Sequence, residues 1–313
     1  MPEYPDVTVY VEALERHIGG TRLDRVRIAH PFLLRTYAPA PADAEGRTVE
    51  GVRRIGKQIV IALSGELFLV IHLMIAGRLR WEKSGAPVPR KLGLAGFDFS
   101  LPGGGAPAGT LIFTEAGTKK RASLHIVSGE ASLRAFDRGG LELDTATLDG
   151  LRFALTRENH TLKRALTDPR LVSGVGNGYS DEILHAARLS PFKQTRSLDD
   201  AELARLLESA RTVLGEWAER LRQESGEGFP MKVTAFRKEM AVHGKFGKPC
   251  PACGTPVQRI VYAENECNYC PTCQTGGKLL ADRALSRLLK EDWPATLAEL
   301  EELKSSMRGP ESG

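Results

Sequence analysis

Four of the five cysteines fall into two Cys-Pro-x-Cys pairs that are separated by sixteen residues. The four residues are Cys250, Cys253, Cys270 and Cys273. This spacing is typical of a four-thiolate zinc ribbon, in which the ion is tetrahedral and has no open position for catalysis. Cys267 also lies three residues before Cys270, but it has no proline after it, so we expect it to be unligated. The sequence therefore predicts one structural Zn²⁺.

A second group of chemical interest stands at the start of the chain, at Pro2 and Glu3. An initiator Met1 before proline is usually removed, which would leave a secondary amine on Pro2. An α-amino group titrates near about 8, so a useful fraction is unprotonated at neutral pH. Such an amine can attack a sugar or carbonyl carbon to form a Schiff base. Taken alone this start is weak evidence, because a solvated, frayed end is the more common case.

Residues 171–179 form a glycine-rich turn that enters a predicted helix. Free backbone N–H groups at such a turn can hold a phosphate, although a tight turn between helices is the more common explanation. Residues 232–248, beside the predicted ribbon, carry five Lys or Arg against one Glu. A positively charged zinc hairpin favours a phosphate-backbone partner. The competing interpretation is a structural zinc site that only stabilises the packing of the C-terminal region.

The elements that must position these residues follow from hydrophobic periodicity. Apolar residues at helical spacing predict a helix over 7–18, which would anchor the N-terminus. From about 21 to 126, short apolar runs between Gly and Pro clusters indicate an antiparallel sandwich or barrel. The predicted strands are Leu23–Ile28, Gln58–Leu63, Leu67–Leu73, Phe97–Leu101, Thr110–Phe113 and Ser123–Ile126.

After residue 140 the pattern becomes helical, which predicts a second domain. Helices are expected at 145–157, 179–189 and 198–221, the last with Ser197 and Asp200 as a capping pair. The ribbon is expected to form a hairpin from Val257–Val261 and Cys267–Tyr269. Two short helices around 280–288 and 297–303, broken at Pro294, would follow.

The composition is that of a globular protein of about two domains. The 313 residues are 42% hydrophobic and 26% charged, with a formal net charge of +4. No run approaches 18 apolar residues, so we expect neither a signal peptide nor a membrane span, and a cytoplasmic location. A charge of +4 alone does not establish a nucleic-acid partner.

In this order the motifs resemble the formamidopyrimidine-DNA glycosylase and endonuclease VIII family, which excises oxidised bases from DNA. The resemblance covers roughly residues 1–276. Its carriers are MPEYPDV at the start, GK at 56–57, HLMIAGRLR at 72–80, LKRALTDPRLVSGVGNGYSDEIL at 162–184, FRKEMAVHGKFGKPCPACGTP at 236–256 and CPTCQ at 270–274. It implies an α+β multidomain fold: an N-terminal antiparallel β-sandwich, a helix-two-turn-helix domain and a C-terminal zinc ribbon. The expected domains are 1–136, 137–230 and 231–276, followed by a C-terminal extension at 277–313, with DNA in the cleft between the first two.

The resemblance also implies roles for individual residues. Pro2 would attack the sugar anomeric carbon and hold it as an iminium, and Glu3 would protonate or stabilise the opening sugar. Lys57 would grip a phosphate near the damaged nucleotide and assist elimination. Lys163 and Asn177 would hold the strand backbone. The expected activity is that of a DNA glycosylase with AP lyase activity in base excision repair, acting on a base rotated out of the stack.

Departures from the family pattern leave an alternative open. The residues that fill the emptied stack are typically Met, Arg and Phe, and here Ile75 and the run Lys119, Lys120 and Arg121 stand there. The hairpin arginine that clamps phosphate aligns with Asn265, and Arg259 on the other strand is a candidate substitute.

The alternative is therefore a DNA-binding protein that keeps the scaffold with lost or altered excision activity. A zinc-ribbon protein that binds RNA or the ribosome would explain the cysteines but not Pro2, Glu3 and Lys57 together. The expected partner is DNA with damaged bases or abasic sites. We expect a monomer of bacterial type that associates with the nucleoid through DNA.

Overall fold

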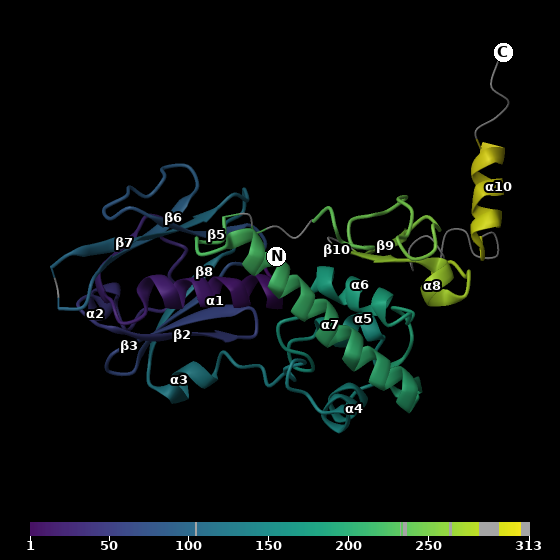
Figure 1. The fold of residues 1–313 in the computed structure, drawn as a ribbon, viewed down its shortest axis with the longest axis horizontal. Coiled ribbons are helices and arrows are strands. Elements are labelled where there is room, and N and C mark those ends of the chain that lie inside the picture. The colour runs from purple at the N-terminus through teal and green to yellow at the C-terminus, as the bar shows by residue number, and fades with distance from the viewer. Residues whose placement is uncertain (104, 232, 234–236, 263–264, 282–293, 308–313) are drawn as a thin grey trace, which may run out of the picture. The chain divides into compact units, whose positions relative to one another are not determined.

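The computed structural model describes residues 1–103, 105–231, 233, 237–262, 265–281 and 294–307, and its fold is drawn in Figure 1. The chain divides into two compact units. The first unit comprises Met1–Gly140, Ser173–Val175 and Leu214–Ala235, and the second comprises Leu141–Val172, Gly176–Val213 and Phe236–Gly313. The domain boundaries expected from the sequence stay predictions.

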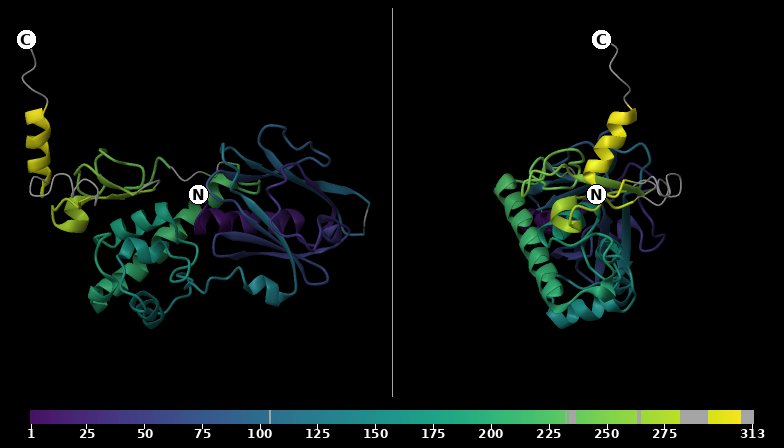
Figure 2. Two further views of the ribbon diagram at one scale, coloured as in Figure 1. Left: turned by 180° about the vertical axis from the view of Figure 1, so that it is seen from behind. Right: turned by 90° about the vertical axis from the view of Figure 1, so that its right-hand side faces the viewer.

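Within the described residues of the first unit, the strands form two four-stranded antiparallel sheets (Figures 1 and 2). One sheet has the order β1-β6-β7-β5 and the other β2-β3-β4-β8. The strands are β1 (Arg22–Ile28), β2 (Val49–Ile55), β3 (Gln58–Leu63), β4 (Leu67–His72), β5 (Gly77–Glu82), β6 (Gly93–Ser100), β7 (Pro107–Glu115) and β8 (Ser123–Ser128). The predicted N-terminal β-sandwich is confirmed. Two short helices, α2 (Pro41–Ala44) and α3 (Glu130–Arg134), lie among its connections.

Two strands, β2 and β5, were not expected from the sequence. Both carry several charged residues, and only Val49 in β2 and Gly77 and Leu79 in β5 are buried. Such segments offer little apolar periodicity, whereas β4 is buried along almost its whole length and reads as an apolar run. The pairing of β2 with β3 and of β5 with β7 therefore decides their conformation.

The helix α1 (Tyr4–Ile18) is buried along one face, which includes Val7, Tyr10 and Leu14. It begins earlier than the predicted helix over 7–18, because Pro5 is well suited to a first helical turn. It packs against β2, where Glu15 Oε2 accepts a hydrogen bond of 2.6 Å from the Val52 N–H. Burial of a large apolar side chain contributes about 1.5–3 kcal/mol, so this face fixes the helix and the chain start firmly in the core.

The described part of the second unit contains α4 (Leu148–Thr156), α5 (Leu162–Thr167), α6 (Asn177–Ala186) and the 3-10 helix η1 (Thr195–Ser197). The long helix α7 (Asp200–Ser225) belongs to it as far as Val213. The helical character of this region is confirmed, although the short helix α5 was not expected. The proposed capping pair of Ser197 and Asp200 is wrong. Asp199 caps α7 instead, because its Oδ1 accepts the Glu202 N–H at 2.8 Å and Glu202 Oε2 accepts the Asp199 N–H at 3.1 Å.

The ribbon consists of the antiparallel pair β9 (Gln258–Tyr262) and β10 (Asn265–Tyr269), followed by α8 (Pro271–Thr275). Farther along lies α10 (Leu297–Met307), which matches the second of the two predicted C-terminal helices. The first predicted helix, around 280–288, falls mostly on residues outside the described part. Among the helices that the structure describes, none has both the length and the apolar character that crossing a membrane requires.

Candidate functional site

The chain start is fixed by the first turn of α1. Pro2 is buried, and Glu3 is 3% exposed. The Asp6 carboxylate accepts a hydrogen bond of 3.0 Å from the Glu3 N–H, and Val7 closes the first helical turn by donating to the Glu3 carbonyl at 2.9 Å. The candidate nucleophile and the candidate acid are thus held at a helix N-terminus rather than on a frayed end.

A three-residue piece of the glycine-rich turn, Ser173–Val175, lies against this start within the first unit. The Tyr4 N–H donates to the Gly174 carbonyl at 2.8 Å, and Lys57 Nζ donates to the Val175 carbonyl at 3.1 Å. The Arg54 guanidinium stacks on the Tyr4 ring, 4.6 Å from its centroid. Neither the part that Gly174 plays here nor the Arg54 stacking was expected from the sequence.

Electrostatics connect these groups further. Burial lowers the pKa of Lys57, while the Glu3 carboxylate acts in the opposite direction. Burial also lowers the pKa of the terminal amine on Met1, against the Glu3 and Asp6 carboxylates, which raise it. The structure therefore brings together a chain start, a carboxylate and a lysine, the residue types that Schiff-base chemistry on a sugar needs.

The turn between β4 and β5 carries Ile75, which is 56% exposed. His72 ends β4 and was missed from the sequence, although it opens the HLMIAGRLR motif. Burial and then Lys57 lower the pKa of His72 to about 4, so the ring is neutral near pH 7, and its Nδ1 accepts the Met74 N–H at 3.1 Å. Arg78 Nη1 donates to the Ile75 carbonyl at 3.2 Å. These two hydrogen bonds hold the turn that carries the exposed Ile75 side chain.

The basic loop after β7 is organised around the buried Glu115. Its carboxylate accepts the Arg121 N–H at 3.0 Å and the Ala122 N–H at 3.2 Å, and Lys120 Nζ donates to the Glu115 carbonyl. Lys119 is exposed. Of the two lysines predicted to contact DNA in this loop, the structure leaves Lys119 at the surface and uses Lys120 to hold the loop.

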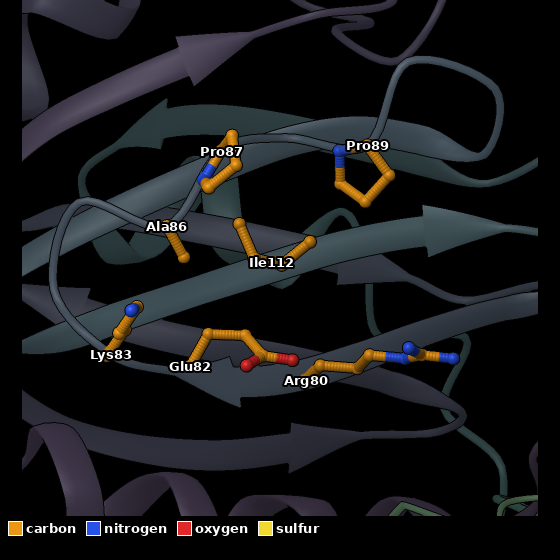
Figure 3. A pocket seen from close by; sticks show the side chains of 7 residues that line it. All are labelled: Arg80, Glu82, Lys83, Ala86, Pro87, Pro89 and Ile112. Carbon is orange, nitrogen blue, oxygen red and sulfur yellow. The ribbon is translucent and has the colours of Figure 1, made fainter.

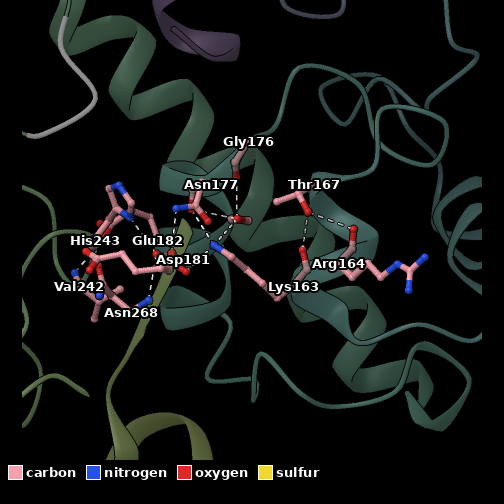
Figure 4. A network of polar contacts seen from close by, with 12 residues as sticks. Lys163, Arg164, Thr167, Gly176, Asn177, Asp181, Glu182, Val242, His243 and Asn268 are labelled. Carbon is pink, nitrogen blue, oxygen red and sulfur yellow. Dashed lines mark hydrogen bonds and ion pairs between the residues drawn. The ribbon is translucent and has the colours of Figure 1, made fainter. Parts of the chain in front are cut away.

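In the second unit, Lys163 and Asn177 are close together (Figure 4). Lys163 Nζ donates to the Asn177 carbonyl at 2.7 Å, and Asn177 Nδ2 donates to the Glu266 carbonyl on β10 at 2.8 Å. Asp181 and His243, which the sequence analysis did not single out, join the same network. The strand contacts predicted for Lys163 and Asn177 stay predictions.

The four cysteine sulfurs of the two Cys-Pro-x-Cys pairs lie within 4.8 Å of one another. They belong to Cys250, Cys253, Cys270 and Cys273. Sulfurs about 2.3 Å from one tetrahedral ion stand about 3.8 Å apart, so the donor set fits Zn²⁺. Cys267 is fully buried on β10 and is not part of the cluster. His185 Nε2 lies 3.2 Å from the Cys250 sulfur.

Arg259, the candidate substitute for the hairpin arginine, faces Asn268 across the hairpin. Its guanidinium lies 4.4 Å from the Phe246 ring centroid and 3.6 Å from Glu266 Oε2. Asn265 is paired with Tyr262 at the end of the ladder, and its side chain lies outside the described residues. DNA contact by Arg259 stays a prediction.

A pocket of about 460 Å³ lies over β5, β7 and the segment that follows β5 (Figure 3). It is lined by Arg80, Glu82, Lys83, Ala86, Pro87, Pro89 and Ile112. None of the residues that the sequence analysis singled out for chemistry lines it. The pocket is therefore separate from the candidate catalytic groups.

Comparison with known families identifies three matching segments. Residues 1–115 match the formamidopyrimidine-DNA glycosylase N-terminal domain, and residues 141–225 match the H2TH domain of the same enzyme. Residues 247–276 match a zinc finger found in FPG and IleRS. The three matches follow the order expected from the motifs.

Similar proteins agree with these matches. The formamidopyrimidine-DNA glycosylase of Thermus thermophilus is 35% identical over 289 residues, covering 88% of this chain and 100% of that protein. An uncharacterized formamidopyrimidine-DNA glycosylase-like protein of Mycobacterium tuberculosis is 41% identical over 164 residues, covering 52% of this chain and 100% of that protein. The solved Lactococcus lactis Fpg in complex with oxidized pyrimidine-containing DNA has a TM-score of 0.75 at 27% identity, covering 88% and 100% of the two chains. This chain therefore belongs to the formamidopyrimidine-DNA glycosylase family, whose members are bifunctional DNA glycosylases and AP lyases of base excision repair.

Proposed function

We propose that this protein removes damaged bases from DNA and cleaves the strand at the abasic site, with the Pro2 amine as nucleophile once Met1 is removed. The observation that carries the proposal is the buried chain start, where Pro2 and Glu3 are held by α1 and Glu3 acts electrostatically on Lys57. A frayed, solvated terminus would make none of these contacts.

In the proposed mechanism the Pro2 nitrogen attacks C1′ of the deoxyribose and the base departs with the electrons of the glycosidic bond. The adduct nitrogen gives its proton to the departing base, and its lone pair then forms the C1′=N bond of the iminium as the bond from C1′ to the ring oxygen breaks. Glu3 donates a proton to that ring oxygen. Loss of a C2′ proton then breaks the C3′–O bond, which is β-elimination. Lys57 holds the neighbouring phosphate as its negative charge grows.

Zinc has a separate, structural task in this proposal. The four clustered cysteines would hold Zn²⁺ as thiolates, and the ion supplies folding energy to the ribbon. The partner is DNA that contains a damaged base or an abasic site, and the DNA contacts expected of Lys119, Asn177 and Arg259 belong to this proposal. We further propose a monomer that works in the bacterial cytoplasm and associates with the nucleoid through DNA.

The test is borohydride trapping on a panel of damaged and abasic oligonucleotides. Borohydride reduces the iminium to a stable amine, so the processed protein should form a covalent adduct. A protein that retains Met1 should bind the same DNA with similar affinity but form no adduct, and a C-terminally tagged protein serves as the matched control. Equal trapping by the Met1-retaining protein would eliminate Pro2 as the nucleophile.

A second candidate function is favoured by one observation, the Asn265 at the position of the hairpin arginine. A neutral amide cannot balance phosphate charge as a guanidinium does. On this view the protein binds damaged DNA with lost or altered excision. It predicts tight binding to an abasic duplex without trapping or strand cleavage by the fully processed protein.

A further inference from the structure

The ammonium group of Lys163 is enclosed by protein acceptors. The side chain is 10% exposed, and Nζ donates to the Asn177 carbonyl at 2.7 Å, to Ser180 Oγ at 2.8 Å and to Asp181 Oδ1 at 2.6 Å (Figure 4). An ammonium has three N–H donors. All three are used inside the protein, so none is left for a phosphate in this conformation.

The Asp181 carboxylate is fully buried and is shared between two parts of the second unit. One oxygen, Oδ1, accepts from Lys163 on α5. The other, Oδ2, lies 2.8 Å from His243 Nδ1 and accepts the backbone N–H of Asn268 on β10 at 3.1 Å. The carboxylate therefore links α5 and α6 both to β10 and to His243, which precedes the zinc ribbon.

Further hydrogen bonds run parallel to this link. The neighbouring Glu182 carboxylate accepts the backbone N–H groups of Ala241, Val242 and His243 at 2.7, 2.9 and 2.8 Å. Asn177 Nδ2 donates to the Glu266 carbonyl on β10 at 2.8 Å. The start of α6 thus holds the ribbon by several buried contacts, and among them Asp181 is the carboxylate that forms an ion pair with Lys163.

We propose that Lys163 and Asp181 are a positioning pair, in which the lysine acts through the aspartate to hold the zinc ribbon on α6. Lys163 is then not a phosphate contact, and its positive charge serves the buried carboxylate. The pair holds β10, which begins at Asn265, beside Asn177 at the start of α6. Only the DNA readout of this inference rests on the proposed function.

Two variants separate the pair from a phosphate contact. Lys163→Met keeps the side-chain length but leaves Asp181 as a buried carboxylate without its lysine, which is strongly destabilising. Lys163→Met combined with Asp181→Asn removes both charges, and replacement of both members of a buried pair is far milder. Recovery in the double variant is the signature of the pair, because removal of an independent phosphate contact cannot be rescued by Asp181→Asn.

The first measurement is the rate at which a chelator in excess removes zinc from the loaded protein without DNA. We expect Lys163→Met to release zinc roughly tenfold faster or more, and the double variant to recover most of this loss, since an unpaired buried charge is the main penalty. Asp181→Asn alone should also accelerate release. If Lys163→Met does not fold, folding of the double variant supports the pair. An unchanged zinc release in Asp181→Asn would overturn it.

The second measurement is the salt dependence of binding to an abasic-analogue duplex. Removal of a phosphate contact flattens the slope of log K against log salt by about one, so Lys57→Met should show that change while its zinc release stays normal. Lys163→Met should weaken binding without changing the slope. A slope reduced by about one in Lys163→Met, with normal zinc release, would make it a phosphate contact instead. Should the unmodified protein bind no such DNA, the proposed function fails, and zinc release still decides the positioning pair.

Discussion

Gly174→Ala should disable the chemistry at the chain start while leaving most of the fold intact. Gly174 has a φ of +75°, and an added Cβ would lie 3.1 Å from Tyr4 Cβ and 3.2 Å from Arg54 Nη1. The left-handed backbone alone costs an alanine about 1–2 kcal/mol. The crowding must in addition push Tyr4 away by a few tenths of an ångström, because both contacts are tighter than ordinary van der Waals distances.

Gly20→Ala is the matched control for this substitution. Gly20 has a similar φ of +73°, and an added Cβ would meet nothing within 4 Å. Both variants should therefore lose a similar 1–2 kcal/mol of unfolding free energy from backbone strain, and Gly174→Ala up to about 1 kcal/mol more if the hydrogen bond from Tyr4 to Gly174 breaks. Urea unfolding measures this difference.

The catalytic consequence should be much larger than the difference in stability. Displacement of a reacting group by about 1 Å can cost 10²-fold in rate, so a smaller shift of the Pro2 and Glu3 segment should slow adduct formation by roughly tenfold. Single-turnover borohydride trapping on an abasic duplex gives the rate. If Gly174→Ala traps as fast as Gly20→Ala, then the contact between the Ser173–Val175 segment and the chain start does not position the nucleophile.

Three further predictions follow from single groups. Cys270→Ser should lose the metal, whereas Cys267→Ala should retain it, because Cys267 lies outside the sulfur cluster, and elemental analysis of zinc decides between them. The Glu3 carboxylate raises the pKa of Lys57, so Glu3→Gln should move the alkaline loss of DNA affinity to lower pH, and Lys57→Arg should abolish this loss since guanidinium stays charged. An unshifted alkaline limb in Glu3→Gln would contradict this coupling. The protein should form mainly β-elimination product, and Asn265→Arg should shift the product towards δ-elimination on a denaturing gel, because a charge-assisted contact is worth roughly 1 kcal/mol more than a neutral one. Predominant δ-product before substitution would mean that another cation already serves the phosphate.

The zinc ribbon and the sandwich were predictable because their signals are local. The spacing of the two cysteine pairs alone dictates a four-sulfur cluster, and the turn within each pair brings its own sulfurs together. Strands such as β4 are apolar along their length and bounded by turns, so the pattern identifies them. Cys267 could be excluded as a zinc ligand on the same local ground, because it is not followed by proline as Cys250 and Cys270 are.

The buried network of Lys163 could not be predicted, because its partners are distant in the chain. Asp181 lies 18 residues from Lys163 and 62 from His243. No periodicity or spacing rule joins these three positions. A lysine in the first turn of a helix is expected to be a charged residue at the surface. Lys163 becomes a buried donor only because α5, α6, His243 and β10 pack together.

The glycine-rich stretch shows that a glycine in a motif can be required by the fold itself. A phosphate-binding turn needs glycines so that backbone N–H groups can approach a ligand. At Gly174 the requirement is steric and internal: φ is +75°, and the carbonyl accepts the Tyr4 N–H. Gly176, two residues later, has a φ of −135°, which any residue can adopt, and it serves as the N-cap of α6. Gly174 therefore positions the chain start, whereas Gly176 begins the helix that holds the ribbon. A substitution at Gly174 should consequently affect chemistry before it affects DNA affinity.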